Sequence, residues 1–94
     1  MTIYQLINDK GNPARNQFVV VKDGKTYFQS YNTMIAEVNN DKVTLSKDWV
    51  YSNTTLKHLY IFLRHEGFQI EEKNDVLKAI KSGEFEVVDE IKIS

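Results

Sequence analysis

The chain has 94 residues, of which 41% are hydrophobic and 27% are charged, and this composition predicts a single globular domain, residues 1–94. Its lack of cysteine excludes disulfides, thiolate zinc sites and cysteine nucleophiles. The formal net charge of −1 is neither the basic surplus of a typical duplex-DNA binder nor the acidic surplus of a nucleic-acid mimic, so it weakly favours a protein or a small ligand as the partner.

The first half of the chain has the pattern of an antiparallel β-meander. A short apolar segment, Ile3–Ile7, precedes a predicted loop at residues 8–17, which holds the only proline. Asp23-Gly24 then separates two runs rich in β-branched and aromatic residues and predicts a type I′ hairpin, because that turn needs positive φ at both central positions. The expected strands are Phe18–Lys22, Lys25–Tyr31, Met34–Val38 and Lys42–Ser46.

Successive side chains of a strand point to opposite faces, so the pattern also assigns faces to the last two of these strands. In the third expected strand, Met34, Ala36 and Val38 share one face, and Ile35 and Glu37 share the other. In the fourth, Val43 and Leu45 are expected to point into the core.

A long helix is predicted next. It is expected to run from about Thr54 to Glu66, with Asn53 or Thr54 as its N-cap. Gly67 is expected in the left-handed conformation just beyond its end, where glycine carries no steric cost. No apolar run in the chain approaches the length needed to span a membrane, and the N-terminus lacks the pattern of a signal peptide.

A shorter helix and a last strand complete the predicted elements. The helix is expected at Asp75–Lys81, with Asn74 as its cap and Gly83 as its stop, and the strand at Glu84–Val88. This order of elements indicates an α+β domain. We expect an antiparallel β-meander of about four to five strands packed against one long and one short helix.

The long helix is apolar on more than one side. At 100° per residue, one stripe combines Leu56, Leu59, Tyr60 and Leu63. We expect its three leucines and Trp49 to be buried against the strands, opposite Val19 or Val21, Val43 and Leu45. A helix with so much apolar surface is either wedged between two layers of the fold or shows an apolar patch to a partner.

Ile61 decides between these two arrangements, because helical geometry points it away from the leucine stripe. An isolated surface isoleucine and packing under the C-terminal strand are two alternatives. The third is an interface with Ile61 as its apolar centre and charged residues as its rim. The candidate partner-binding residues on this reasoning are Lys57, Ile61, Arg64 and His65.

Two groups of residues contain side chains that are common in metal or catalytic sites. His58 and His65 are seven positions apart, about 10 Å on a helix, which is too far for one metal ion, so we expect no metal. The hydroxyl residues Ser52, Thr54 and Thr55 lie near His58, yet hydroxyls before a helix are what capping requires. We therefore expect no catalytic residue, no cofactor and no enzymatic activity.

Two further groups are candidates for an acid–base site and for a base-stacking face. The acidic residues Glu71, Glu72 and Asp75 are expected on a solvated surface, because adjacent glutamates diverge. Tyr27 and Tyr31 can share a strand face, where they would stack single-stranded bases, with packing under a helix as the alternative.

Two blocks of the sequence carry a resemblance to known proteins. They are Phe28–Ala36, with the pattern SYxTxIA, and Trp49–Leu63, with the pattern YSxTTxKHxxxFL. This pattern resembles a group of small, poorly characterised proteins of bacteriophages and mobile elements, over about residues 18–63. The resemblance implies a viral or mobile-element origin and a place of action in the cytoplasm of a bacterial host, and it assigns no catalytic residue.

These observations lead to one functional hypothesis and two alternatives. We expect a non-enzymatic phage accessory protein that binds and occludes a host protein or protein–nucleic-acid complex, with an anti-defence inhibitor of the anti-CRISPR type as its most specific form. The alternatives are a nucleic-acid-binding accessory protein and a structural or self-assembling phage component, including a homodimer. Direct binding to nucleic acid is less favoured by the charge, and no membrane partner is expected.

Overall fold

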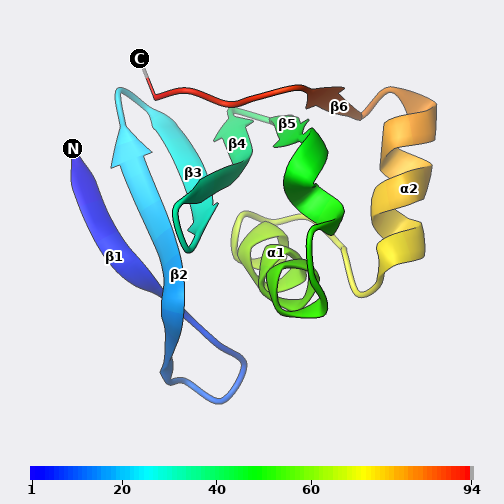
Figure 1. Cartoon of the computed structure of the whole chain (residues 1–94). Helices are drawn as coiled ribbons and strands as arrows, with labels where there is room; N and C mark the ends of the chain where they lie inside the picture. Colours follow the sequence, from blue (N-terminus) through cyan, green and yellow to red (C-terminus); the bar gives the residue numbers. More distant parts are fainter. Residues whose placement is uncertain (94) are drawn as a thin grey trace.

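The computed structural model describes residues 1–93, which form one six-stranded sheet, one 3₁₀ helix and two α-helices (Figure 1). The elements are β1 Thr2–Ile7, β2 Pro13–Lys22, β3 Lys25–Ser30, β4 Thr33–Asn39, β5 Lys42–Ser46, η1 Lys47–Val50, α1 Asn53–His65, α2 Lys73–Ser82 and β6 Phe85–Val88. The strands lie side by side in chain order, β1 to β6. The first five are antiparallel, and β6 is parallel to β5. The predicted α+β class is confirmed.

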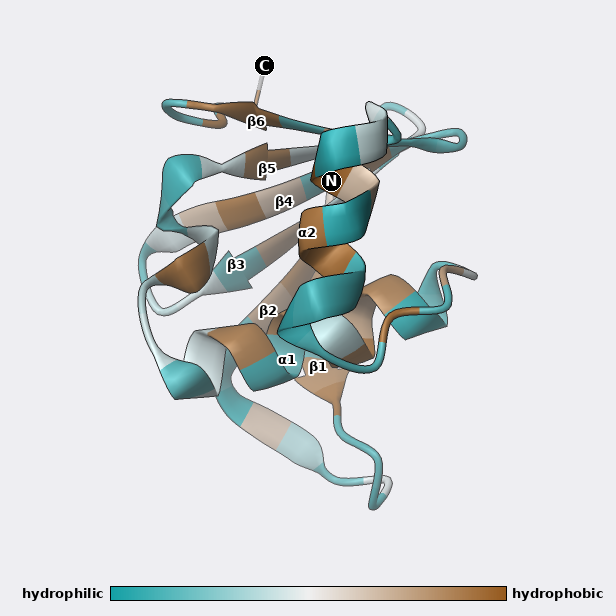
Figure 2. Ribbon diagram, turned by 90° about the vertical axis from the view of Figure 1, so that its right-hand side faces the viewer, coloured by the Kyte–Doolittle hydropathy of each residue, from teal (hydrophilic) through white to brown (hydrophobic). Residues whose placement is uncertain are grey.

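Both α-helices lie on one side of the sheet. Figure 1 shows α1 between the sheet and α2, and Figure 2 views the sheet from the helix side with α2 in front. This layering explains why α1 is apolar on more than one side. Its buried residues Leu59, Ile61, Phe62 and Leu63 belong to the same core as the strand residues. Phe62 also stacks on Phe28 of β3, with ring centroids 5.5 Å apart.

The predicted core is largely confirmed. Val19, Val43, Leu45, Trp49, Leu59 and Leu63 are all buried in one cluster. Leu56, Tyr60 and Val21 are only partly buried and pack against its margin.

The hairpin at Asp23-Gly24 is confirmed. Both residues have positive φ, 52° and 78°, and Lys22 pairs with Lys25 across the turn. This conformation is that of a type I′ turn, which follows the right-handed twist of the flanking strands.

The loop predicted at residues 8–17 is too long. β2 begins at Pro13, so only residues 8–12 connect it to β1. Asn8 closes this short loop, because its Oδ1 accepts the N–H groups of Lys10 and Asn12. The proline misled the prediction, since the first residue of a strand tolerates proline.

The face assignments of Met34 and Ile35 are wrong, because β4 does not alternate regularly. Ala36 pairs with Phe28 and Met34 with Gln29, so Ile35 is an extra residue in β4. A bulge of this kind lets Ile35 and Ala36 both face the helices. Met34 instead packs on the opposite face of the sheet.

That opposite face is covered in part by the C-terminal segment. After β6 the chain runs back across the sheet (red in Figure 1), and Ile91 packs with Val20 and Tyr27. Tyr27 is therefore buried, and its burial together with the Glu37 carboxylate raises the pKa of its phenol. Tyr31 lies in the turn after β3, which ends at Ser30. The two tyrosines therefore do not share a strand face, and the predicted base-stacking face does not exist.

The helix ends differ from the predicted caps. The N-cap of α1 is Ser52, whose Oγ accepts the backbone N–H of Thr55, and not Asn53 or Thr54. The N-cap of α2 is Glu72 and not Asn74. Asp75 holds that end of α2 by accepting the backbone N–H groups of Glu71 and Glu72. Gly67 and Gly83 end the two helices with positive φ, as predicted.

Candidate functional site

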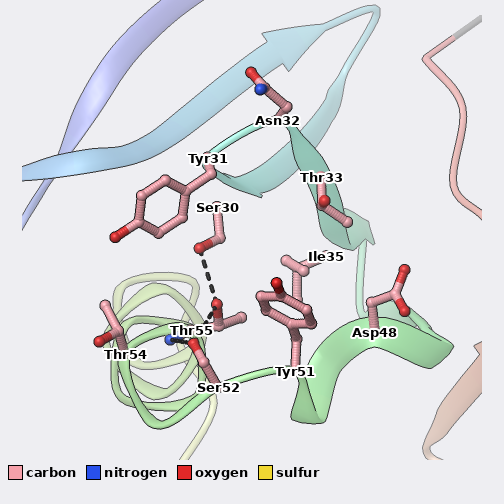
Figure 3. A pocket seen from close by; sticks show the side chains of 10 residues that line it. All are labelled: Ser30, Tyr31, Asn32, Thr33, Ile35, Asp48, Tyr51, Ser52, Thr54 and Thr55. Atoms are coloured by element: carbon pink, nitrogen blue, oxygen red, sulfur yellow. Dashed lines mark hydrogen bonds between the residues drawn. The ribbon is translucent and has the colours of Figure 1, made fainter.

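The two sequence blocks that carry the resemblance meet in space around one pocket. The pocket has a volume of about 660 Å³ and lies between the β3–β4 turn and the start of α1 (Figure 3). Its lining residues are Ser30, Tyr31, Asn32, Thr33, Ile35, Asp48, Tyr51, Ser52, Thr54 and Thr55. All of these except Asp48 belong to the two blocks.

Three hydroxyl groups fix one side of this pocket. The Oγ of Ser30 and the Oγ1 of Thr55 are 3.0 Å apart, and Ser52 donates to the same Thr55 oxygen over 3.1 Å. Because Thr55 Oγ1 accepts from Ser52, its own hydrogen is free to be donated to Ser30. Ser30 and Thr55 are buried, and buried hydroxyls without such partners would be costly.

Local sequence explains this hydroxyl cluster. Ser52 has an extended backbone and caps α1, which places Thr55 at the third position of the helix with its side chain against the sheet. Ser30 ends β3 on the face that carries the helices. The hydrogen bond therefore joins the last residue of a strand to the first turn of a helix, and the two chain segments form one wall.

Two tyrosines stand at the edges of the pocket. Tyr31 exposes 51% of its surface and Tyr51 exposes 79%, and they come from opposite sides of the opening. Tyrosine gives large, rigid contact area with a polar tip, and it is enriched among the residues that dominate binding energy. Exposed aromatic residues beside a hollow are a better candidate for a contact surface than scattered apolar side chains.

The backbone of Tyr31 is unusual for its residue type. Four non-glycine residues within 1–93 have positive φ, and the other three are Asn or Asp. Tyr31 has φ 56° and is held there by two hydrogen bonds. Its N–H donates to the carbonyl of Asn16, and its carbonyl accepts from Gln29 Nε2. A bulky residue in this region costs energy that glycine or asparagine would avoid, so these hydrogen bonds offset the cost of the conformation.

The electrostatic character of the pocket is nearly neutral. Asp48, a half-buried residue of η1, is the single charged residue among those that line it. Hydroxyl, amide and phenol groups supply the remaining polar contacts. Such a surface suits hydrogen bonds to uncharged polar groups and stacking on flat ones, and it is a poor match for phosphate.

The predicted interface centred on Ile61 is wrong. Ile61 exposes only 1% of its surface and lies in the main core, which contradicts both the interface and the isolated surface isoleucine. The helical wheel placed Ile61 away from the leucine stripe, and the core cluster that holds it also includes Val76 and Ala79 of α2.

The other three predicted residues do not form a common patch around an apolar centre. Lys57 and His65 are exposed on α1. Arg64 is tied to its own domain, because its guanidinium contacts Asp9 at 3.1 Å and Glu71 at 3.6 Å and donates to the carbonyl of Ile70.

The two histidines were weighed above as a metal site and, for His58, as the partner of a hydroxyl. His58 Nδ1 is 2.8 Å from the backbone carbonyl of Thr54, not from a hydroxyl, so the hydroxyls near it serve the helix cap. In the described part of the chain, His, Asp and Glu side chains form no group of three that could hold a metal ion. Glu71 and Glu72 are exposed, as predicted, whereas Asp75 serves the α2 end.

Sequence reasoning missed the pocket as a unit. It placed Tyr31 on a strand face with Tyr27, and Tyr51 entered only as part of the second block. The signal that could have found the pocket was a hydroxyl–aromatic pair in each block, Ser30-Tyr31 in the first and Tyr51-Ser52 in the second. Their meeting depends on the long-range packing of α1 on β3.

Comparison with known proteins gives one match. Residues 1–78 match a protein family described as a family of unknown function (DUF8033), and because this covers most of the chain, the protein belongs to that family. The match includes every residue that lines the pocket. Searches of curated proteins and of solved structures find no match. No helix in residues 1–93 is long and apolar enough to cross a membrane.

Proposed function

We propose that this DUF8033 protein is a non-enzymatic binding protein that contacts a partner protein through Tyr31, Tyr51 and the pocket between them. The observation that carries the proposal is the placement of two exposed tyrosines on either side of a hollow whose wall is held by buried hydroxyl hydrogen bonds. Aromatic side chains at the edge of a preorganised hollow are the kind of residue that supplies most of the binding energy at protein interfaces.

The chemistry of the pocket favours a protein over a nucleic acid. Its one charged lining residue, Asp48, is acidic, and it would repel a phosphate backbone. Uncharged hydroxyls and amides match the polar groups of a polypeptide, while the two phenols can cover an apolar or aromatic side chain of the partner.

The finer form of this proposal is a bacteriophage accessory protein that occludes a host protein in the bacterial cytoplasm, with an anti-defence inhibitor of the anti-CRISPR type as its most specific version. The resemblance of Phe28–Ala36 and Trp49–Leu63 to small phage proteins supports it. The same two blocks supply nine of the residues around the pocket.

The proposal is tested with three tagged forms of the full chain: wild type, the double variant Tyr31→Ala/Tyr51→Ala, and Val50→Ala. Val50 is a matched control, because it is an exposed apolar neighbour of Tyr51 that does not line the pocket. Each form is used to capture proteins from a host-cell lysate, and captured proteins are compared by quantitative mass spectrometry. The expected result is a partner retained by wild type and by Val50→Ala and lost from the tyrosine variant.

Two outcomes would contradict the proposal. A partner captured equally by the tyrosine variant would place the binding surface elsewhere, and Lys57→Ala/His65→Ala would then test the outer face of α1. Binding that weakens steeply as salt rises, with nucleic acid in the captured material, would favour the nucleic-acid-binding alternative.

A further inference from the structure

The outer edge of β1 is the least protected part of the sheet. β1 is the first strand in the sheet order and pairs with β2 on one side, and within residues 1–93 no strand pairs with its other side. Its backbone therefore presents a row of N–H and C=O groups that a further strand can complete. Ile3 and Ile7, 60% and 40% exposed, lie along this edge strand.

Edge strands of natural proteins are normally guarded against pairing by charged residues, proline or a bulge. The segment Thr2–Ile7 has no charged residue and no proline. An irregularity does occur between Gln5, which pairs with Phe18, and Ile7, which pairs with Pro13. The single residue Leu6 of β1 therefore lies opposite residues 14–17 of β2. The extra residues belong to β2, so β1 stays a continuous strand at the open edge.

The opposite edge of the sheet is different. β6 has four residues, and acidic residues lie within it and on both sides: Glu84, Glu86, Asp89 and Glu90. Two β6 edges would bring these carboxylates together, and a β1–β6 contact between copies would give an open chain of molecules without charge complementarity. A contact between two β1 strands is neutral and closes as a two-fold dimer.

Antiparallel pairing of β1 with itself also matches side chains. With Gln5 at the two-fold axis, Ile3 of one copy lies opposite Ile7 of the second copy, and the same pair recurs on the other side of the axis. Ile3, Gln5 and Ile7 share one face by strand alternation. That face adjoins Val20, the partner of Ile3 on β2, so the isoleucine pairs would extend an apolar surface already present.

We propose that two copies of this chain associate through antiparallel pairing of their β1 strands, centred on Gln5, which joins the two six-stranded sheets into one. The partner is a second copy rather than a foreign strand, because the edge is free of charge and self-complementary in this register, whereas a strand selected from another protein needs no such symmetry.

The test measures the mass of the full, tag-free chain by sedimentation velocity over a wide range of concentration. Wild type is expected to reach twice the chain mass. The variant Ile3→Lys/Ile7→Lys places like charges opposite each other across the pair and is expected to raise the dimer dissociation constant roughly tenfold or more. The matched control is Leu77→Lys, an exposed apolar residue of α2, which is expected to remain dimeric.

A charge-swapped variant tests the register. Ile3→Lys/Ile7→Glu places opposite charges across the two-fold axis and is expected to dimerise more tightly than the dilysine variant. All exchanged residues are exposed, and circular dichroism checks that each variant is folded. Three results would each overturn the proposal. They are a wild-type chain that stays monomeric, a dilysine variant that dimerises as well as wild type, and a charge-swapped variant that dimerises no more tightly than the dilysine variant. Capture through Tyr31 and Tyr51 would be unaffected by such a failure, so the two proposals fail separately.

Discussion

Ser30 and Thr55 lie 25 positions apart in the chain and share a buried hydrogen bond of 3.0 Å between their side-chain oxygens. This bond connects the end of β3 to the first turn of α1 and forms one wall of the pocket. Because Ser52 donates to the same Thr55 oxygen, the position of the helix cap and the shape of the pocket depend on one another.

Removing the central hydroxyl should therefore cost stability. Thr55→Val keeps the shape of the side chain but leaves the hydroxyls of Ser30 and Ser52 without that partner, and we expect a loss of about 1–3 kcal/mol in the free energy of unfolding by urea. In a double-mutant cycle, Ser30→Ala combined with Thr55→Val should cost less than the two single changes added together. Strict additivity would show that the bond does not form in solution.

The cap of α1 is expected to be Ser52 and not its neighbours. Ser52→Ala removes the acceptor for the Thr55 N–H and should lower stability by about 0.5–2 kcal/mol. Asn53→Ala is the matched control and should change stability much less, since the Asn53 side chain is exposed and does not cap the helix. Equal losses for the two variants in a denaturant melt would contradict this assignment.

Ile61 is expected to behave as a core residue. Ile61→Asp would bury an unpaired carboxylate between α1 and its neighbouring layers and should abolish cooperative unfolding, whereas His65→Asp on the exposed face should leave the chain folded. The measurement is thermal unfolding followed by circular dichroism. A folded Ile61→Asp variant would contradict the burial of Ile61.

The lowered pKa of Asp75 predicts that part of the folding stability is lost in acid. Backbone N–H groups of Glu71 and Glu72 lower the pKa of its carboxyl from the ordinary value of 3.8. The folded chain thus binds this proton less readily than the unfolded chain, so the stabilisation is present above pH 3.8 and is lost as the pH falls through the lower folded value. Asp75→Asn should therefore lose stability at neutral pH and differ less from wild type in strong acid. Parallel stability curves across that range would contradict the role of this carboxylate.

Local patterns in the sequence predicted local structure well. Asp23-Gly24 specifies its hairpin by itself, because the turn type depends on two residues. The parallel pairing of β6 depends on β5, a partner far along the chain. The Ile35 bulge lies between the adjacent strands β3 and β4, and it has no sequence signal of its own. Ile61 shows the same limit, since a helical wheel gives the direction of a side chain but not the number of layers around the helix.

The candidate site was predictable only in its parts. The hydroxyls before α1 were correctly interpreted as capping groups, although the wrong residues were chosen. The pocket itself needs Ser30 beside Thr55 and Tyr31 opposite Tyr51, and these placements arise from the packing of α1 on β3.

The most direct test of the central claim is an NMR titration of the isotope-labelled chain with its purified partner. Backbone amide signals of Ser30–Ile35 and Asp48–Thr55 should shift or broaden together, and Tyr31→Ala/Tyr51→Ala should reduce affinity by roughly 30-fold or more, as for the loss of about 2 kcal/mol at a central contact. Perturbations confined to α2 or to the outer face of α1, with both segments of the pocket unchanged, would contradict the account.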